Sequence, residues 1–115
     1  MTDTPPLARF DRIFQALADP HRRGFVERLA KGPASVKELA APMDVGLPAV
    51  LKHLRILEEG GIVVSEKVGR VRTYRMRQDA FDAVNQWIEA RQAEMHSAFD
   101  QLASLMAEIP EDKDH

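Results

Sequence analysis

Apolar residues recur at helical spacing along most of this chain, and β-forming residues gather in two short runs. Repeats at i, i+3 and i+4 mark the buried face of a helix, and they predict amphipathic helices over residues 7–18, 20–31 and 47–59. The segment Ser35-Val36-Lys37-Glu38 has the form of a capping box, which predicts a further short helix from residue 36 on. The first 60 residues are therefore expected to form four helices.

Proline and glycine set the boundaries of these helices. The pair Asp19-Pro20 ends the first helix and opens the second, because the residue before a proline avoids the α region and Pro fits the first helical position. Gly32-Pro33 closes the second helix, and Gly60-Gly61 closes the fourth. The residues expected on the buried stripe of the fourth helix are Leu47, Val50, Leu54 and Leu57.

Two runs rich in β-forming residues follow, over residues 62–68 and 71–77. Gly69-Arg70 lies between them and is a strong signal for a tight β-hairpin. A long helix is then expected over residues 79–109, with Asp79 as its cap.

A short capped helix, a tight turn, a second helix and a β-hairpin form the layout of a winged helix-turn-helix. In that arrangement the second helix lies in the DNA major groove and the hairpin reaches an adjacent groove or the backbone. The predicted fold class is mainly α (α+β), in one domain over residues 7–109. Its parts are a helix-turn-helix (35–60), a wing (62–77) and a dimerisation helix (79–109), between ends expected to be disordered (1–6 and 110–115).

The composition is that of a single ordinary globular domain, with 115 residues of which 44% are hydrophobic and 30% charged. The absence of cysteine excludes disulfides, thiolate metal sites and thiol redox sensing. No apolar run approaches the ~20 residues of a membrane span, and the first residues have no signal-peptide pattern. We therefore expect a cytoplasmic protein.

The net charge of −2 hides a strong asymmetry along the chain. Residues 1–77 hold 14 Lys and Arg against 9 Asp and Glu, a balance of +5, whereas residues 78–115 hold 2 against 9, a balance of −7. A basic region joined to an acidic one indicates two tasks, of which one is to meet a polyanion. Chance clustering on solvated faces is the alternative.

The densest basic segment is the predicted second helix of the helix-turn-helix together with the hairpin. From Leu47 to Arg77 there are seven Lys and Arg against three Glu, as phosphate neutralisation requires. Edge strands also carry cations to prevent aggregation, but such edges usually mix signs, so we favour DNA contact. The predicted DNA-binding residues are Ser35, Pro48, Ala49, Lys52, His53, Arg55, Lys67, Arg70, Arg72 and Arg75.

Four stretches in this order resemble the ArsR-type winged-helix repressors: residues 16–23 (ALADPHRR), 36–40 (VKELA), 48–61 (PAVLKHLRILEEGG), and Gly69-Arg70 with Tyr74-Arg75-Met76. The chain looks particularly like the subgroup with an early Trp (Trp87) in the last helix and no metal motif. The resemblance implies a homodimer that docks on a palindromic operator and represses transcription. Members commonly have Ser and Gln where Gly46 and Leu47 stand, and often Ser where Leu51 stands. Base reading is then expected to rest on Lys52, His53 and apolar contact with thymine methyls from Pro48 or Ala49.

The last predicted helix carries a heptad pattern. One core position holds Phe81, Ile88, Met95, Leu102 and Ile109, and the other holds Val84, Arg91, Ala98 and Leu105. A helix of about 28 residues spans ~40 Å, which is longer than the rest of the domain can cover. We therefore expect a second copy of the chain, although packing within one chain with a frayed end is the alternative. The predicted dimer-interface residues are Phe10, Ile13, Phe14, Trp87, Ile88, Met95, Phe99, Leu102 and Leu105.

Other chemistry finds little support. Glu94-Met95-His96 followed by Glu108 only faintly resembles the family's metal site on the last helix, and His21 and His115 show no partners in sequence, so no metal and no cofactor are expected. A Gly-rich phosphate loop, a nucleophile elbow and a paired acid and base are all missing, which argues against an enzyme. The alternative function is a winged-helix protein-interaction module without operator specificity; a small-molecule effector stays unidentified.

Overall fold

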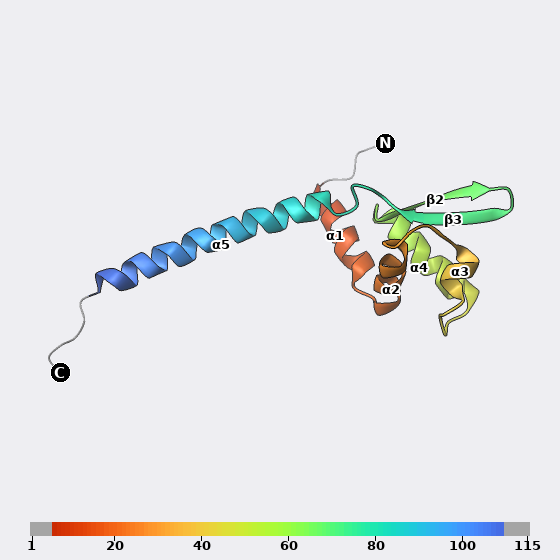
Figure 1. The fold of residues 1–115 in the computed structure, drawn as a ribbon, viewed down its shortest axis with the longest axis horizontal. Helices are drawn as coiled ribbons and strands as arrows, with labels where there is room; N and C mark the ends of the chain where they lie inside the picture. Colours follow the sequence, from red (N-terminus) through yellow and green to blue (C-terminus); the bar gives the residue numbers. More distant parts are fainter. Residues whose placement is uncertain (1–5, 110–115) are drawn as a thin grey trace. The chain divides into compact units, whose positions relative to one another are not determined.

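A computed structural model describes residues 6–109. The elements follow in the order α1 (Pro6–Leu17), α2 (Pro20–Leu29), β1 (Ala34–Ser35), α3 (Val36–Ala40), α4 (Leu47–Glu59), β2 (Val63–Val68), β3 (Val71–Met76) and α5 (Asp82–Glu108) (Figure 1). They divide into two units, the body (residues 6–81) and the segment that contains α5. The ends predicted to be disordered lie outside the described residues, except Pro6, which begins α1.

The predicted starts of α2 and α3 are confirmed in atomic detail. The Asp19 carboxylate accepts a hydrogen bond of 3.1 Å from the backbone N–H of Arg22 and so caps α2. At α3, the Ser35 hydroxyl accepts from the Glu38 N–H at 3.1 Å and the Glu38 carboxylate accepts from the Ser35 N–H at 2.8 Å. This is the predicted capping box, and it fixes the entry into the helix-turn-helix.

The sheet holds one strand more than the sequence predicted. Its order is β1-β3-β2, with β1 paired to β3 through Ala34↔Tyr74 and Ser35↔Thr73. A strand of two residues has no alternation that a sequence can display.

At the hairpin tip Gly69 has a φ of 63°. Among the described residues only glycines have positive φ, so the second central residue, Arg70, does not. This is the pattern of a type II′ turn, which has Gly at its first central position.

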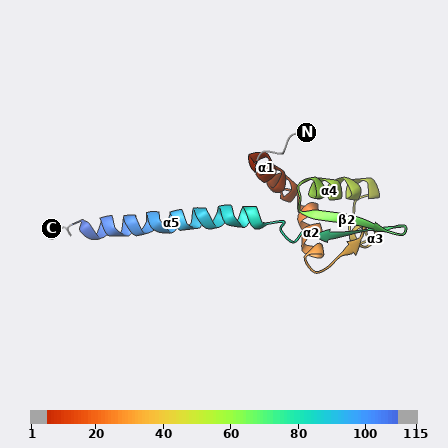
Figure 2. The same ribbon diagram turned by 90° about the horizontal axis from the view of Figure 1, so that it is seen from above.

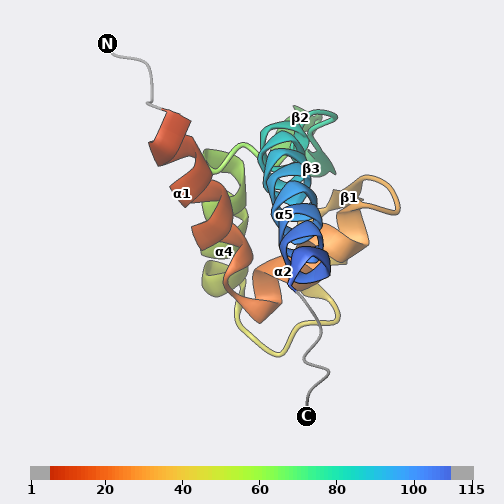
Figure 3. The same cartoon turned by 90° about the vertical axis from the view of Figure 1, so that its left-hand side faces the viewer.

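The core of the body lies between the helices and the sheet. Its largest fully buried side chains come from the three helices α2, α3 and α4, from the start of β2 and from the residue before it: Phe25, Leu39, Val50, Leu54, Leu57, Ile62 and Val63. Helix α1 lies alongside α4, and β2 runs next to α4 (Figures 2 and 3). Gly60 allows the close approach of α1, because a Cβ there would stand 3.2 Å from the Arg12 carbonyl oxygen.

Two local expectations are wrong. Leu47, placed on the buried stripe of α4, is 53% exposed, because the first turn of α4 projects beyond the core formed by Val50, Leu54 and Leu57. Asp79 does not cap the last helix, since α5 begins at Asp82. The Asp79 carboxylate instead pairs with the Arg77 guanidinium at 3.1 Å, and this ion pair lowers the pKa of Asp79.

Helix α5 is continuous over 27 residues, about 40 Å at 1.5 Å per residue. Within it, the Arg91 guanidinium packs 5.0 Å from the centre of the Trp87 ring and pairs with Glu94 at 3.0 Å. The charge that interrupts the heptad pattern is therefore accommodated by neighbours one turn away on the same helix. In the described part of the chain, no helix has the length and apolar character to cross a membrane.

Candidate nucleic-acid interface

The helix-turn-helix consists of α3, the turn at residues 41–46, and α4. Helix α4 packs its inner stripe into the body, which turns the opposite side outward. Of the side chains predicted on that outer side, Pro48, Lys52 and Arg55 are exposed and Ala49 is half-buried. Ser35, the cap of α3, is also half-buried. The outer face of α4 therefore presents two cations beside apolar side chains.

The wing, formed by β2 and β3, adds a row of cations. Lys67, Arg70, Arg72 and Arg75 are all exposed. Lys67 stands directly opposite Arg72 in the antiparallel register. Like charges in such a pair destabilise a hairpin, so this pairing indicates a requirement other than stability.

Hydrogen bonds hold one wing cation in place. The Arg72 guanidinium donates to the Ser65 hydroxyl at 2.9 Å, and this hydroxyl donates to the Glu58 carboxylate at 3.0 Å. The chain of contacts links β3 through β2 to the last turn of α4. It sets the position of the wing relative to α4 within the body.

Between the wing and the helix-turn-helix lies an open groove of about 680 Å³. Its lining includes Lys37 of α3, Leu47 of α4, and Arg70 and Arg72 of the wing. Lys52, Arg55, Lys67, Arg70, Arg72 and Arg75 have no carboxylate within 4.0 Å among residues 6–109. The surface therefore offers a set of cations that the body does not neutralise at close range.

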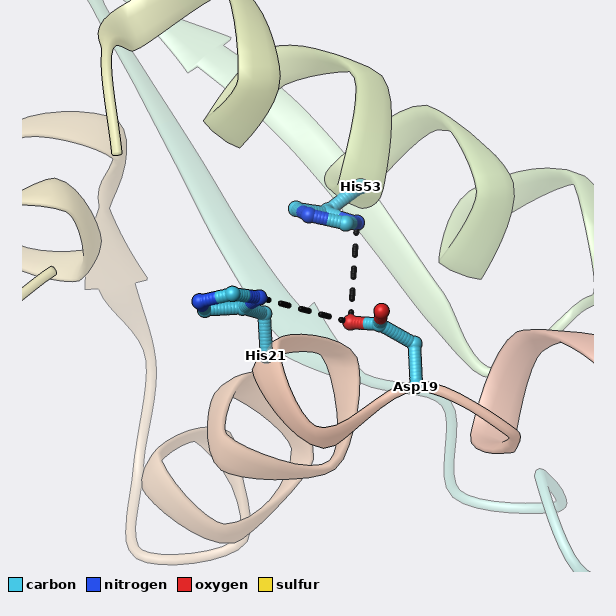
Figure 4. A group of neighbouring side chains, drawn as sticks. All are labelled: Asp19, His21 and His53. Carbon is cyan, nitrogen blue, oxygen red and sulfur yellow. Dashed lines mark ion pairs between the residues drawn. The ribbon is translucent and has the colours of Figure 1, made fainter. Parts of the chain in front are cut away.

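His53 differs from the other predicted DNA-binding residues. Its side chain is 16% exposed and faces α2, where Nδ1 lies 3.9 Å from Asp19 Oδ2 (Figure 4). Its ring stacks on that of His21 with centroids 5.4 Å apart. The expectation that His21 has no partner is wrong, because its Nδ1 also lies 3.7 Å from Asp19 Oδ2. His21 and His53 are 32 positions apart in the chain, so no local sequence pattern reveals the contact between their rings.

Burial, hydrogen bonding and nearby charges shift the pKa values of two members of this cluster. Burial lowers the pKa of His53 and the nearby Arg22 cation lowers it further, while Asp19 acts in the opposite direction. Burial works to raise the pKa of Asp19, but the hydrogen bond from the Arg22 N–H and the charges of His53 and Arg22 lower it on balance. The arrangement favours an ionised carboxylate next to a neutral His53 imidazole.

The structure adds two residues to the outer face of α4 that the sequence analysis did not select. Leu47 and Leu51 are 53% and 39% exposed. They stand at positions where the family resemblance showed apolar residues in place of polar ones, and this departure was the signal available in the sequence. Both side chains are placed for contact with a surface outside the chain.

The predicted dimer residues fall into two classes. Ile13 is 7% exposed and belongs to the core of the body, whereas Phe14 is 49% exposed and stacks on Phe10 at 6.4 Å. On α5, every predicted residue is at least 40% exposed: Trp87, Ile88, Met95, Phe99, Leu102 and Leu105. An exposed apolar row of this length is a candidate contact surface.

Comparison with known proteins places this fold among bacterial regulators. A family profile described as a helix-turn-helix domain matches residues 17–66. The HTH-type transcriptional regulator Rv2034 of Mycobacterium tuberculosis is 47% identical over 66 residues, which are 57% of this chain and 62% of that protein. The chain thus spans about three-fifths of the length of this relative.

Solved structures extend the similarity over most of the chain. The crystal structure of an ArsR family transcriptional regulator has 43% sequence identity and a TM-score of 0.75, and the match covers 84% of this chain and 98% of that chain. The homodimeric winged helix-turn-helix DNA-binding domain Mb0332 from Mycobacterium bovis has 25% identity and a TM-score of 0.62, and the match covers 84% of this chain and 96% of that chain. Fold, sequence and helix-turn-helix geometry agree: the chain belongs to the ArsR family of winged helix-turn-helix regulators.

Proposed function

We propose that this protein binds double-stranded DNA as a homodimer and represses transcription from a palindromic operator. The observation that carries this proposal is the wing and α4 surface, on which six exposed cations have no carboxylate within 4.0 Å in the described chain. The direct opposition of Lys67 and Arg72 costs stability unless an anion lies between or beside them. DNA phosphates supply such anions along a continuous line.

The residues divide into two roles. We assign phosphate contact to Lys67, Arg70, Arg72 and Arg75 of the wing, because exposed cations on a projecting hairpin meet the backbone of a neighbouring groove. We assign base contact to Lys52 and Arg55 of α4, with Pro48, Ala49, Leu47 and Leu51 as apolar contacts for thymine methyl groups. In this proposal His53 and the Ser35 cap stand behind the contact surface and hold α4 and α3 in place.

The dimer is proposed to form through α5. Its exposed apolar row repeats with the heptad spacing that two packed helices require, and Phe10 and Phe14 of α1 are candidates to extend it. Homodimeric assembly of the M. bovis relative supports the same assembly here. Two α4 helices related by a two-fold axis then read half-sites spaced by about 10 bp or a multiple of it.

The test is a binding titration by fluorescence anisotropy. A duplex selected from a random pool and an unrelated duplex are compared at several salt concentrations, with Arg70→Ala and Arg72→Ala as variants. Lys31→Ala is the matched control, because Lys31 is an exposed cation in the turn that follows α2. We expect each wing variant to weaken binding to both duplexes and to reduce the salt slope by about 1, as one lost phosphate contact does. Wing variants that bind with the wild-type salt slope, or a selected pool with no palindrome, would contradict the proposal.

The same experiment distinguishes a DNA-binding repressor from the alternative function, a protein-interaction module whose basic face binds an acidic protein. Such a module gives no selected palindrome and no preference between the two duplexes. We further propose that the protein is cytoplasmic and not an enzyme; its relatives are named as regulators.

A further inference from the structure

Asp19, His21 and His53 bring two imidazoles and one carboxylate together where α2 begins and α4 passes (Figure 4). One donor atom from each residue lies within 4.8 Å of the other two, and all three side chains are intermediate in exposure. We propose that this cluster is a binding site for a divalent transition metal, with Zn(II) as the preferred ion. It joins the start of α2 to the helix that we propose reads DNA.

The distances are short enough for a small adjustment to close the site. Two donors on a tetrahedral Zn(II) ion, with bonds of about 2.0–2.1 Å, stand about 3.4 Å apart. Asp19 Oδ2 is already 3.7 Å from His21 Nδ1 and 3.9 Å from His53 Nδ1. Because none of the three donors is more than 4.8 Å from another, each pair has to close by at most about 1.4 Å to reach this spacing.

The surroundings of His21 also suit a metal ligand. While its Nδ1 faces Asp19, its Nε2 lies 3.7 Å from a carboxylate oxygen of Asp44. A ligating imidazole usually directs its other N–H to a carboxylate, which fixes the tautomer and increases the donor strength. Two imidazoles and one carboxylate match the protein donors that Zn(II) accepts at sites where water is the fourth ligand.

Arg22 limits the strength of the site and defines a competition. Its Nη1 lies 3.2 Å from His53 Nδ1, while its Nε and Nη2 donate to the carbonyls of Ala16 and Gln15 at 2.7 and 2.9 Å. Of these three guanidinium contacts, metal binding has to replace only the one with His53, because the other two hold the guanidinium against the end of α1. The contact itself requires an unprotonated Nδ1, which is the form that binds metal.

The full-length chain, freed of metal with a chelator and then dialysed, tests this proposal with Co(II) as the spectroscopic probe. We expect visible absorption typical of a low-symmetry, tetrahedral site, and its loss when Zn(II) is added in competition. His21→Gln and His53→Gln should each weaken Co(II) binding about tenfold or more, since loss of a ligand costs at least as much as loss of its supporting partner. Asp19→Asn should also weaken binding while it keeps the N-cap of α2, because Asn caps as well as Asp.

His96→Gln is the matched control, because His96 is an exposed histidine on α5 and lies outside the cluster. It should bind Co(II) with wild-type affinity, and circular dichroism should show equal helix content in all variants. Absence of the absorption band in the wild-type protein, or equal Co(II) affinity in the wild type and both histidine variants, would overturn the proposal. The titration contains no DNA and the anisotropy experiment is run with chelator, so failure of one proposal is distinguishable from failure of the other.

Discussion

The body buries its large apolar side chains, whereas α5 leaves most of its own exposed. In the body, side chains such as Phe25, Leu54 and Ile62 are at most 2% exposed. On α5, which is more than twice as long as α1, the apolar side chains of Phe99, Leu102 and Leu105 are 51–61% exposed. The difference shows that the body has a core of its own, whereas the apolar row of α5 needs another surface to cover it.

Removing a core side chain from the body should have the largest effect, because it tests whether the body has a core of its own. Leu54 is fully buried on the inner face of α4, so Leu54→Ala should lower the free energy of unfolding by about 2–5 kcal/mol. Urea unfolding followed by circular dichroism measures the change. An effect below about 1 kcal/mol would mean that the body is not the independently packed unit described here.

The matching change on α5 should act on assembly. Leu102→Asp places a charge in the proposed interface and should raise the dimer dissociation constant by about 100-fold or more, which corresponds to about 2.7 kcal/mol. Sedimentation should give about twice the chain mass of 12.9 kDa for the wild type and a monomer for the variant at the same micromolar concentration. Glu89→Gln, an exposed polar position on the same helix, serves as the control. A monomeric wild type would remove the proposed role of α5.

A third prediction concerns the outer face of the body. Lys52→Ala should cost on the order of 1–3 kcal/mol of discrimination between the selected duplex and an unrelated one, because Lys52 is proposed to contact a base. The difference between the two anisotropy titrations measures it. Equal losses on both duplexes would place Lys52 among the phosphate contacts of the wing.

A smaller effect is expected at the start of α3. Ser35→Ala removes the hydroxyl that accepts from the Glu38 N–H and should destabilise the body by about 1 kcal/mol. Ser35→Asp keeps an acceptor at the same place and should restore most of the loss in thermal unfolding. Equal losses in both variants would show that the cap does not hold α3.

The smallest effect is a pH dependence within the body. Burial lowers the pKa of His53 below its ordinary value of 6.5, and the charges of Arg22 and Lys52 act in the same direction while Asp19 opposes them. The unfolded chain then binds more protons than the folded one, so this contribution is complete above pH 6.5 and is lost as the pH falls through the folded pKa. Between about pH 7 and pH 5, metal-free wild type should lose more stability than His53→Gln. His96→Gln should keep the wild-type slope, and parallel slopes for wild type and His53→Gln would contradict the assignment.

Local sequence determined most of the secondary structure. The caps at Asp19 and Ser35, the turn at Gly69 and the stop at Gly60 act within four residues, so their side chains and backbone preferences suffice to place helix starts and the hairpin. The heptad spacing of α5 and the row of cations on the wing could also be predicted from the sequence, because each pattern repeats along one continuous segment. These features led to the winged helix-turn-helix and to most of the proposed interface.

Tertiary structure alone decided the contacts between distant segments. The pairing of β1 with β3, the exposure of Leu47 and the start of α5 at Asp82 depend on how far the core extends, which no periodicity encodes. The cluster of Asp19, His21 and His53 depends on the packing of α2 against α4. Helical periodicity gives the direction of a side chain around its own axis, but only the packed neighbour determines what that side chain meets.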